Sequence, residues 1–158
     1  PNWHHTLVLE TECQLKQTFF GAHLIPNHDL PIAVAEGAKA AVIMSIIRPE
    51  YIWVSAESKG GLSKSKCESI AEYNVTLFPD AGCYELWKSK GDSYGFNTTK
   101  EVELLMHKGY IKDGDDITDY YLNWPEFRAA LKPKKVKKYD PKWKAFVKQN
   151  PELELKKN

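Results

Sequence analysis

The sequence has no long apolar run and few cysteines, and these absences exclude several classes of protein. No hydrophobic segment approaches the roughly 18 residues that a membrane-spanning helix needs. The cysteines, Cys13, Cys67 and Cys83, are scattered and form no C-x-x-C pair, so they indicate neither a disulfide framework nor a zinc ribbon. The P-loop pattern G-x-x-x-x-G-K and the nucleophile elbow G-x-S-x-G are also missing. We therefore expect a protein of the reducing cytoplasm, with no membrane partner.

The length and composition fit one globular domain. The chain has 158 residues, of which 42% are hydrophobic and 27% charged, enough for a sizeable core but not for two full domains. It begins at Pro1 with neither an initiating methionine nor a signal-peptide pattern, so we expect an internal or processed piece of a longer protein.

Charge is distributed unevenly along the chain. Residues 132–158 contain ten lysines and three acids, a local charge of +7, whereas the rest of the chain carries −6 and the total is +1. A basic tail on an acidic body is typical of proteins that contact phosphate backbones, although a solvated tail without a partner has the same composition. Residues 142–148 predict a short helix whose apolar face docks on the body rather than stacking on bases. The tail lysines that we expect to bind nucleic acid are Lys134, Lys135, Lys137 and Lys138.

Short apolar segments alternate with helix-length segments through the first two thirds of the chain. The patterns predict strands at 32–35, 51–54 and 74–78, and helices at 38–47, 63–70 and 83–90. Weaker signals predict a strand at 94–96, a helix that Thr99 caps, and helices at 117–122 and 127–131. Strands joined through helices form βαβ units, so we expect an α/β fold with a small, mostly parallel sheet flanked by helices.

These patterns divide the chain into three parts. Residues 1–30 are expected to be a lead-in segment that packs on the core, and residues 31–122 the α/β core itself. Residues 123–158 are expected to be a helical, lysine-rich extension.

Two carboxylates occupy matching positions after predicted strands. Glu36 follows the first strand and Asp80 the third, and Gly37 and Gly82 come soon after them. Parallel sheets bind ligands at the carboxyl ends of their strands, so neighbouring strands would bring Glu36 and Asp80 face to face. Two close carboxylates favour a bound proton or a divalent cation, and Mg²⁺ suits oxygen ligands and phosphate. The alternative is that each acid only caps the helix that follows it.

The order of these motifs resembles the Toprim domain of primases and topoisomerases. Residues 34–37 (Val-Ala-Glu-Gly), followed by an alanine-rich helix, resemble its first motif, and residues 76–82 stand in the place of its D-x-D motif. Residues 114–120 resemble a segment that follows this domain in some primases. The likeness, through 19–122, is to Toprim-like, primase-related proteins of Bacteroidetes mobile elements, a largely uncharacterised family.

The resemblance implies roles for particular residues. Glu36 would be the general acid or base and Asp80 a magnesium ligand, so both are candidate catalytic residues and metal ligands. The family's second aspartate falls at Gly82, which cannot bind metal, and Asp115 or Asp116 would then replace it, with Asp116 taken as the third ligand. No segment of this sequence resembles the zinc-binding domain of primases, whose cysteine spacing would be recognisable.

Lysines near the predicted strand ends complete the candidate site. Lys59, Lys64 and Lys66 flank the Gly60-Gly61 loop, where they contact either phosphate or only solvent. Together with Lys39 they are our candidates in the body for nucleic-acid binding.

Three functions remain open on the sequence alone. The first is Mg²⁺-assisted phosphoryl transfer on nucleic acid during replication or transfer of a mobile element. The second is a catalytically degenerate module that only binds DNA, RNA or a replication protein. The third is an enzyme acting on a small phosphorylated molecule.

Overall fold

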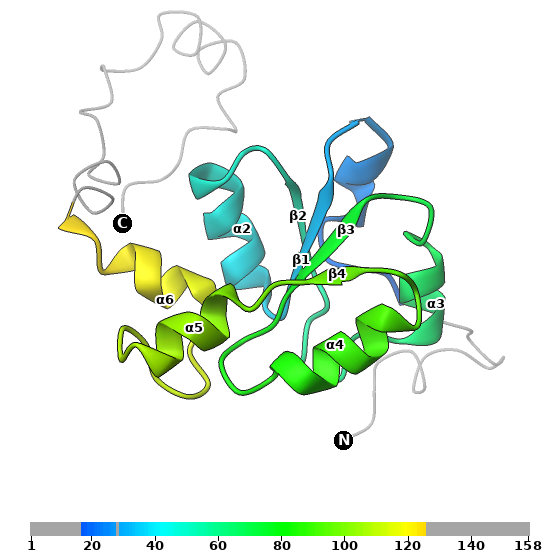
Figure 1. Cartoon of the computed structure of the whole chain (residues 1–158). Helices are drawn as coiled ribbons and strands as arrows, with labels where there is room; N and C mark the ends of the chain where they lie inside the picture. Colours follow the sequence, from blue (N-terminus) through cyan, green and yellow to red (C-terminus); the bar gives the residue numbers. More distant parts are fainter. Residues whose placement is uncertain (1–16, 28, 126–158) are drawn as a thin grey trace, which may run out of the picture. The chain divides into compact units, whose positions relative to one another are not determined.

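The computed structural model describes residues 17–27 and 29–125, and the chain divides into two compact units at Leu122 and Asn123. The described residues of the first unit form four strands and six helical segments (Figure 1). In chain order they are the 3₁₀ helix η1 (Ala22–Asn27), β1 (Ile32–Ala35), α2 (Ala38–Ile47), β2 (Ile52–Ser55), α3 (Lys64–Glu68), β3 (Val75–Phe78), α4 (Tyr84–Asp92), β4 (Asn97–Thr98), α5 (Glu101–His107) and α6 (Ile117–Leu122). The predicted helices at 127–131 and 142–148 and the four tail lysines lie outside the described residues.

The four strands form one parallel sheet in the order β2-β1-β3-β4. Ile32 of β1 is paired with Ile52 of β2 on one side and with Val75 of β3 on the other. All four residues of β1 are buried, as their uninterrupted apolar sequence predicts for a strand covered on both faces. The prediction of an α/β fold with a small parallel sheet is confirmed.

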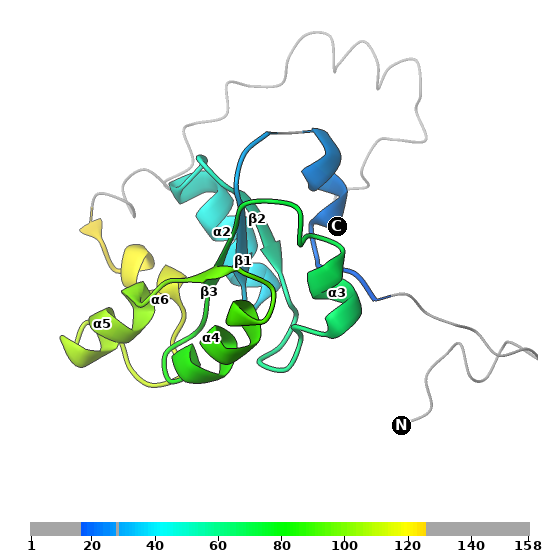
Figure 2. The ribbon, with the colours of Figure 1, turned by 45° about the vertical axis from the view of Figure 1, so that its right-hand side comes forward.

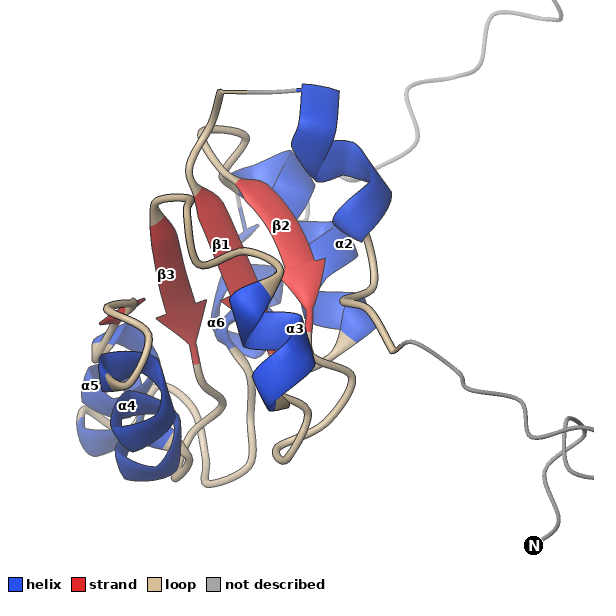
Figure 3. Ribbon diagram, turned by 90° about the vertical axis from the view of Figure 1, so that its right-hand side faces the viewer, coloured by secondary structure: helices blue, strands red, loops and turns tan. Residues whose placement is uncertain are grey.

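Helices cover both faces of this sheet (Figures 2 and 3). Alternate residues of each strand point to opposite faces, so Ile32 and Val34 join a core cluster with α3 and α4, while Ala33 and Ala35 join another with α2, α5 and α6. The chain runs from β1 outward to β2 and then back across to β3. Right-handed crossovers in opposite directions put α2 on one face and α3 on the other.

The fourth strand lies at Asn97–Thr98, so the prediction of a strand at 94–96 is wrong. The helix before it ends in a Schellman motif, in which the Phe96 amide donates to the Gly91 carbonyl at 3.0 Å and the Gly95 amide to the Asp92 carbonyl at 3.3 Å. Gly95 has a φ of +72°, which suits glycine at this position. Residues 94–96 are therefore used to end α4, and the strand begins only after them.

Candidate functional site

The candidate site lies at the carboxyl ends of β1 and β3, which are adjacent in the sheet. From β1 the chain leaves through α2 toward β2, and from β3 it leaves through α4 toward β4, in opposite directions across the sheet. Such a reversal of strand order leaves a crevice where ligands of open α/β sheets bind. The N-termini of α2 and α4 begin at this edge, and helix N-termini favour anions such as phosphate.

Glu36, the first residue after β1, has a buried carboxylate oxygen without a partner. Its Oε2 atom makes no hydrogen bond to any of the described residues. Leaving a buried carboxylate oxygen unpaired is unfavourable by about 1–3 kcal/mol or more. A carboxylate in this state is suited to receive a proton or a cation from outside the protein.

Asp80 interacts electrostatically with Glu36, as the strand positions predicted. Burial is the largest cause and acts together with the negative charges of Glu36 and Asp116 to raise the pKa of Asp80 to about 7, although the positive charge of Lys39 opposes them. Asp80 therefore exchanges its proton near neutral pH, where a carboxyl group in water is fully ionised. Two close carboxylates favour a proton or a divalent cation, so this pair could hold either one.

Cys83 lies beside Glu36, although no motif in the sequence assigned it to the site. It is the N-cap residue of α4 and is 7% exposed. Burial raises the pKa of the Cys83 thiol, and the Glu36 carboxylate raises it further while the Lys59 ammonium lowers it. The raised pKa keeps the thiol protonated at neutral pH, close enough to the carboxylate to be influenced by its charge. Its position in the loop after β3, three residues beyond Asp80, was the signal that could have placed it here.

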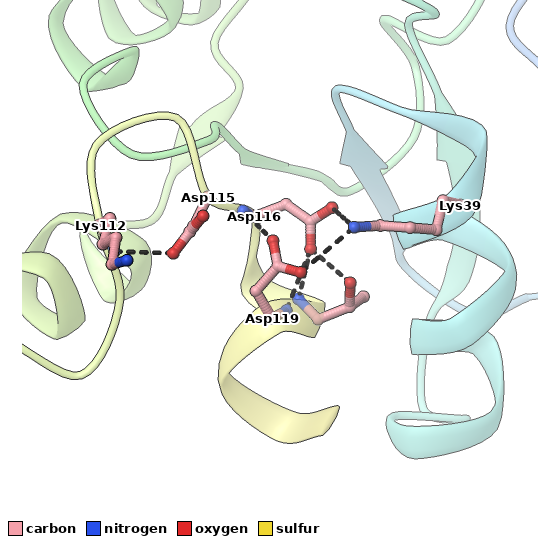
Figure 4. Close-up of polar contacts among 6 residues, drawn as sticks. Lys39, Lys112, Asp115, Asp116 and Asp119 are labelled. Carbon is pink, nitrogen blue, oxygen red and sulfur yellow. Dashed lines mark hydrogen bonds and ion pairs between the residues drawn. The ribbon is translucent and has the colours of Figure 1, made fainter. Parts of the chain in front are cut away.

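Asp116 caps helix α6 in a reciprocal arrangement (Figure 4). Its Oδ1 atom accepts from the Thr118 amide at 2.7 Å, from the Thr118 hydroxyl and from the Asp119 amide at 3.2 Å. The Asp119 Oδ2 atom in turn accepts from the Asp116 amide at 2.9 Å, which completes a capping box. The spacing of two aspartates three residues apart was a sequence signal for this cap that we did not use.

Lys39 of α2 binds the same two aspartates. Its Nζ atom lies 2.8 Å from Asp116 Oδ2 and 3.3 Å from Asp119 Oδ1. Burial opposes ionisation of Asp116, but hydrogen bonds from Lys39 and Thr118 lower its pKa below the usual value. Both Asp116 oxygens thus have partners within the protein, and these contacts assign Asp116 to the cap and leave its ligand role a prediction. Asp115 accepts from the Lys112 amide at 2.7 Å (Figure 4).

The other candidate lysines differ in their surroundings. Lys59 is exposed and its ammonium acts on the Cys83 thiol at the candidate site. Lys64 is exposed on α3 and lies 3.7 Å from Glu68, one helical turn along.

Lys66 was expected to contact phosphate or solvent beside the Gly60-Gly61 loop, but its side chain is buried in the protein. The residue is only 5% exposed, its Nζ atom donates to the Ala56 carbonyl at 3.1 Å, and it lies 5.6 Å from the centre of the Phe19 ring. Lys66 therefore stabilises the chain between β2 and α3 rather than facing a ligand. Sequence alone did not reveal this, because a lysine in a polar segment such as residues 63–66 is normally solvated.

Gly82 cannot be replaced by an aspartate without strain. Its φ is +78°, and a Cβ atom there would collide with Asp113 Oδ1. The Gly82 amide donates to Glu103 Oε2 at 3.3 Å, which fixes the loop in this conformation. The conformation of the loop after Asp80 thus favours glycine where the Toprim pattern has its second acid.

The carboxylate pair fits the way in which proteins bind Mg²⁺. Within the part of the chain that the structure describes, no group of three or more His, Cys, Asp or Glu residues is arranged to hold a metal ion. Mg²⁺ usually keeps several waters and uses one or two protein carboxylates together with substrate phosphates. The free Glu36 oxygen and the nearby Asp80 could supply that number of protein ligands.

The described helices include none that is long and apolar enough to cross a membrane.

A family model described as "Domain of unknown function (DUF6371)" matches residues 1–81, half of the chain, and the chain belongs to this family. The matched residues include Glu36 and Asp80 and end before Gly82. No curated protein and no solved structure matches the chain.

Proposed function

We propose that this member of the DUF6371 family is a Toprim-like, primase-related domain that binds Mg²⁺ through Glu36 and Asp80 and acts on the phosphates of nucleic acid. The observation that carries the proposal is the buried, unpartnered Oε2 atom of Glu36 beside Asp80, at the point where the strand order reverses. The Toprim resemblance of residues 34–37 and 76–82 supplies the reaction class. Replication or transfer of a mobile element is the setting that this resemblance implies.

The residues of the site have separate tasks in this proposal. When bound, Mg²⁺ would polarise a phosphoryl oxygen and screen its charge. Glu36 would hold or accept a proton at Oε2, the role that the resemblance assigns to this glutamate. Asp80 would give up its proton when the cation binds, because the positive charge stabilises the ionised carboxylate. The N-termini of α2 and α4 would orient the phosphate.

Paramagnetic line broadening tests the metal site directly. Mn²⁺ is titrated into the wild type and into Glu36→Gln and Asp80→Asn, with amide signals followed by NMR. We expect saturable broadening around residues 36–37 and 80–83, lost in both variants. Glu72→Gln is the matched control, because Glu72 is exposed and precedes β3 at the opposite edge of the sheet. Absence of site-specific broadening, both alone and with DNA present, would contradict the proposal.

Activity assays follow if the metal binds. Nuclease and primase assays with Mg²⁺ compare the wild type with Glu36→Gln. A second variant, Glu36→Asp, keeps a carboxylate at this position. If it binds Mn²⁺ like the wild type but loses turnover, proton transfer by Glu36 is separated from metal binding. Full activity in Glu36→Gln would remove Glu36 from the mechanism.

The conformation at Gly82 favours a second candidate function, a module that binds nucleic acid or a replication partner without catalysis. No side chain fits at residue 82 without strain, so the D-x-D pattern is incomplete. This function predicts DNA binding that weakens with salt, survives Glu36→Gln, and weakens when tail lysines are neutralised. Fluorescence anisotropy with labelled DNA measures it, using glutamine at Lys134, Lys135, Lys137 and Lys138. Binding that is unaffected by these four changes would exclude a role for the tail.

A further inference from the structure

We propose that Lys39 sets the affinity of the Glu36–Asp80 pair for a divalent cation. Its ammonium group is a positive charge near these carboxylates, and it lowers their affinity for the cation. The inference rests on the proposed function, since it concerns the same two carboxylates. It adds a regulator of their affinity that no sequence motif assigns.

The position of Lys39 follows from the start of α2. The helix begins at Ala38, directly after Glu36 and Gly37, so Lys39 is in its first turn and close to the carboxyl end of β1. Its ammonium reaches across to the N-terminal end of α6, where it pairs with both Asp116 and Asp119 (Figure 4). Lys39 therefore links α2 to the N-terminal end of α6, next to the loop that follows β1.

The charges around Asp80 show why this ammonium matters for a cation. Glu36, Asp116 and Asp119 all act on Asp80 as negative charges, and Lys39 acts on it as a positive charge. A divalent cation at Glu36 and Asp80 is attracted by the carboxylates and repelled by the ammonium. A unit charge acts on a divalent cation over about one Debye length, so removing this one should tighten binding by about tenfold at low salt.

A purely structural role for Lys39 predicts a different result. The Lys39 side chain is 55% exposed, and ion pairs in contact with water contribute little to stability. Asp116 is also held by Thr118 and Asp119 through the capping box, so the loop keeps its conformation when the lysine charge is removed. If Lys39 only tied α2 to α6, its loss would leave cation affinity unchanged or weaken it.

Electron paramagnetic resonance of free Mn²⁺ measures the affinity on the full chain. We expect Lys39→Gln to lower the Kd by about tenfold, and Lys39→Arg, which keeps the charge, to remain near the wild type. Lys88→Gln is the matched control, because Lys88 pairs with Asp92 at 2.7 Å on α4, and it should not change the Kd. Amide spectra of each variant confirm that it is folded.

A double variant locates the gained affinity. In Lys39→Gln combined with Glu36→Gln the gain should disappear, because the cation has lost one of its two carboxylates. If the gain persists, the cation has moved to the freed Asp116 and Asp119, and the inference is overturned. An unchanged or weaker affinity in Lys39→Gln also overturns it, while binding by the wild type would leave the proposed function intact.

Two further outcomes separate the inference from the proposed function. In the first, Lys39→Gln binds Mn²⁺, the wild type does not, and the double variant loses the binding again. This result would support the inference and indicate that the wild type needs substrate phosphates to bind the cation. Binding by neither protein, with and without DNA, would refute the proposed function and the inference together.

Discussion

Replacing Asp80 with asparagine should stabilise the protein at alkaline pH and have little effect at acid pH. The asparagine has nearly the same size and removes only the charge that burial, Glu36 and Asp116 oppose. In the folded protein the pKa of Asp80 is about 7, compared with the ordinary value of 3.8 that applies to the unfolded chain.

The sign follows from which state holds the proton. Below pH 3.8 both states are protonated and Asp80 makes no difference between them. Between 3.8 and about 7 the unfolded chain loses its proton while the folded protein keeps it, so the free energy of unfolding falls as pH rises. Above pH 7 the loss is complete and constant. At 1.36 kcal/mol per pKa unit it is on the order of 4 kcal/mol.

Urea unfolding followed by tryptophan fluorescence measures this effect, because Trp53 and Trp87 are buried. Asp80→Asn should gain about 1 kcal/mol over the wild type at pH 4.5 and about 4 kcal/mol at pH 8.5, in buffers without divalent cations. Asp29→Asn is the control, because Asp29 is exposed and precedes β1 at the opposite edge; its effect should stay within about 0.5 kcal/mol at both pH values. A gain that does not depend on pH, or a loss at pH 8.5, would refute the reasoning.

Other perturbations test the remaining contacts. Mg²⁺ should raise the melting temperature of the wild type more at pH 8.5 than at pH 5, because cation and proton compete for Asp80, and it should not do so for Asp80→Asn. Gly82→Ala should lower the free energy of unfolding by about 1–3 kcal/mol, since its φ is +78° and a Cβ would meet Asp113; an unchanged value would mean that the loop relaxes. Asp116→Ala should lower the free energy of unfolding, measured with urea, by about 1–2 kcal/mol because the α6 cap is lost. An unchanged free energy would show that the cap does not stabilise the protein. Lys66→Ala should lower the melting temperature without changing the salt dependence of DNA binding, because its ammonium bonds the Ala56 carbonyl; weaker binding in a folded variant would return Lys66 to the nucleic-acid surface.

The local elements of the core were determined by the sequence itself. The uninterrupted apolar run Ile32–Ala35 and the helix-forming run Ala38–Ile47 are a strand and a helix with the predicted bounds, because each depends on preferences of residues close together in the chain. The positions of Glu36 and Asp80 after strands followed from the same patterns. The predicted strand at 94–96 failed because hydrogen bonds to Gly91 and Asp92 use those residues to end α4.

The relations between these elements were decided only by the tertiary structure. The placement of β3 beside β1, which brings Asp80 to Glu36, depends on the direction of two crossovers and on which helix covers each face. The pair between Lys39 and Asp116 and the burial of Lys66 depend on packing between segments that are separate in the sequence. Periodicity specifies which residues face a core, but the partner of a charged side chain is set by whichever distant element packs against it, and that information is not local.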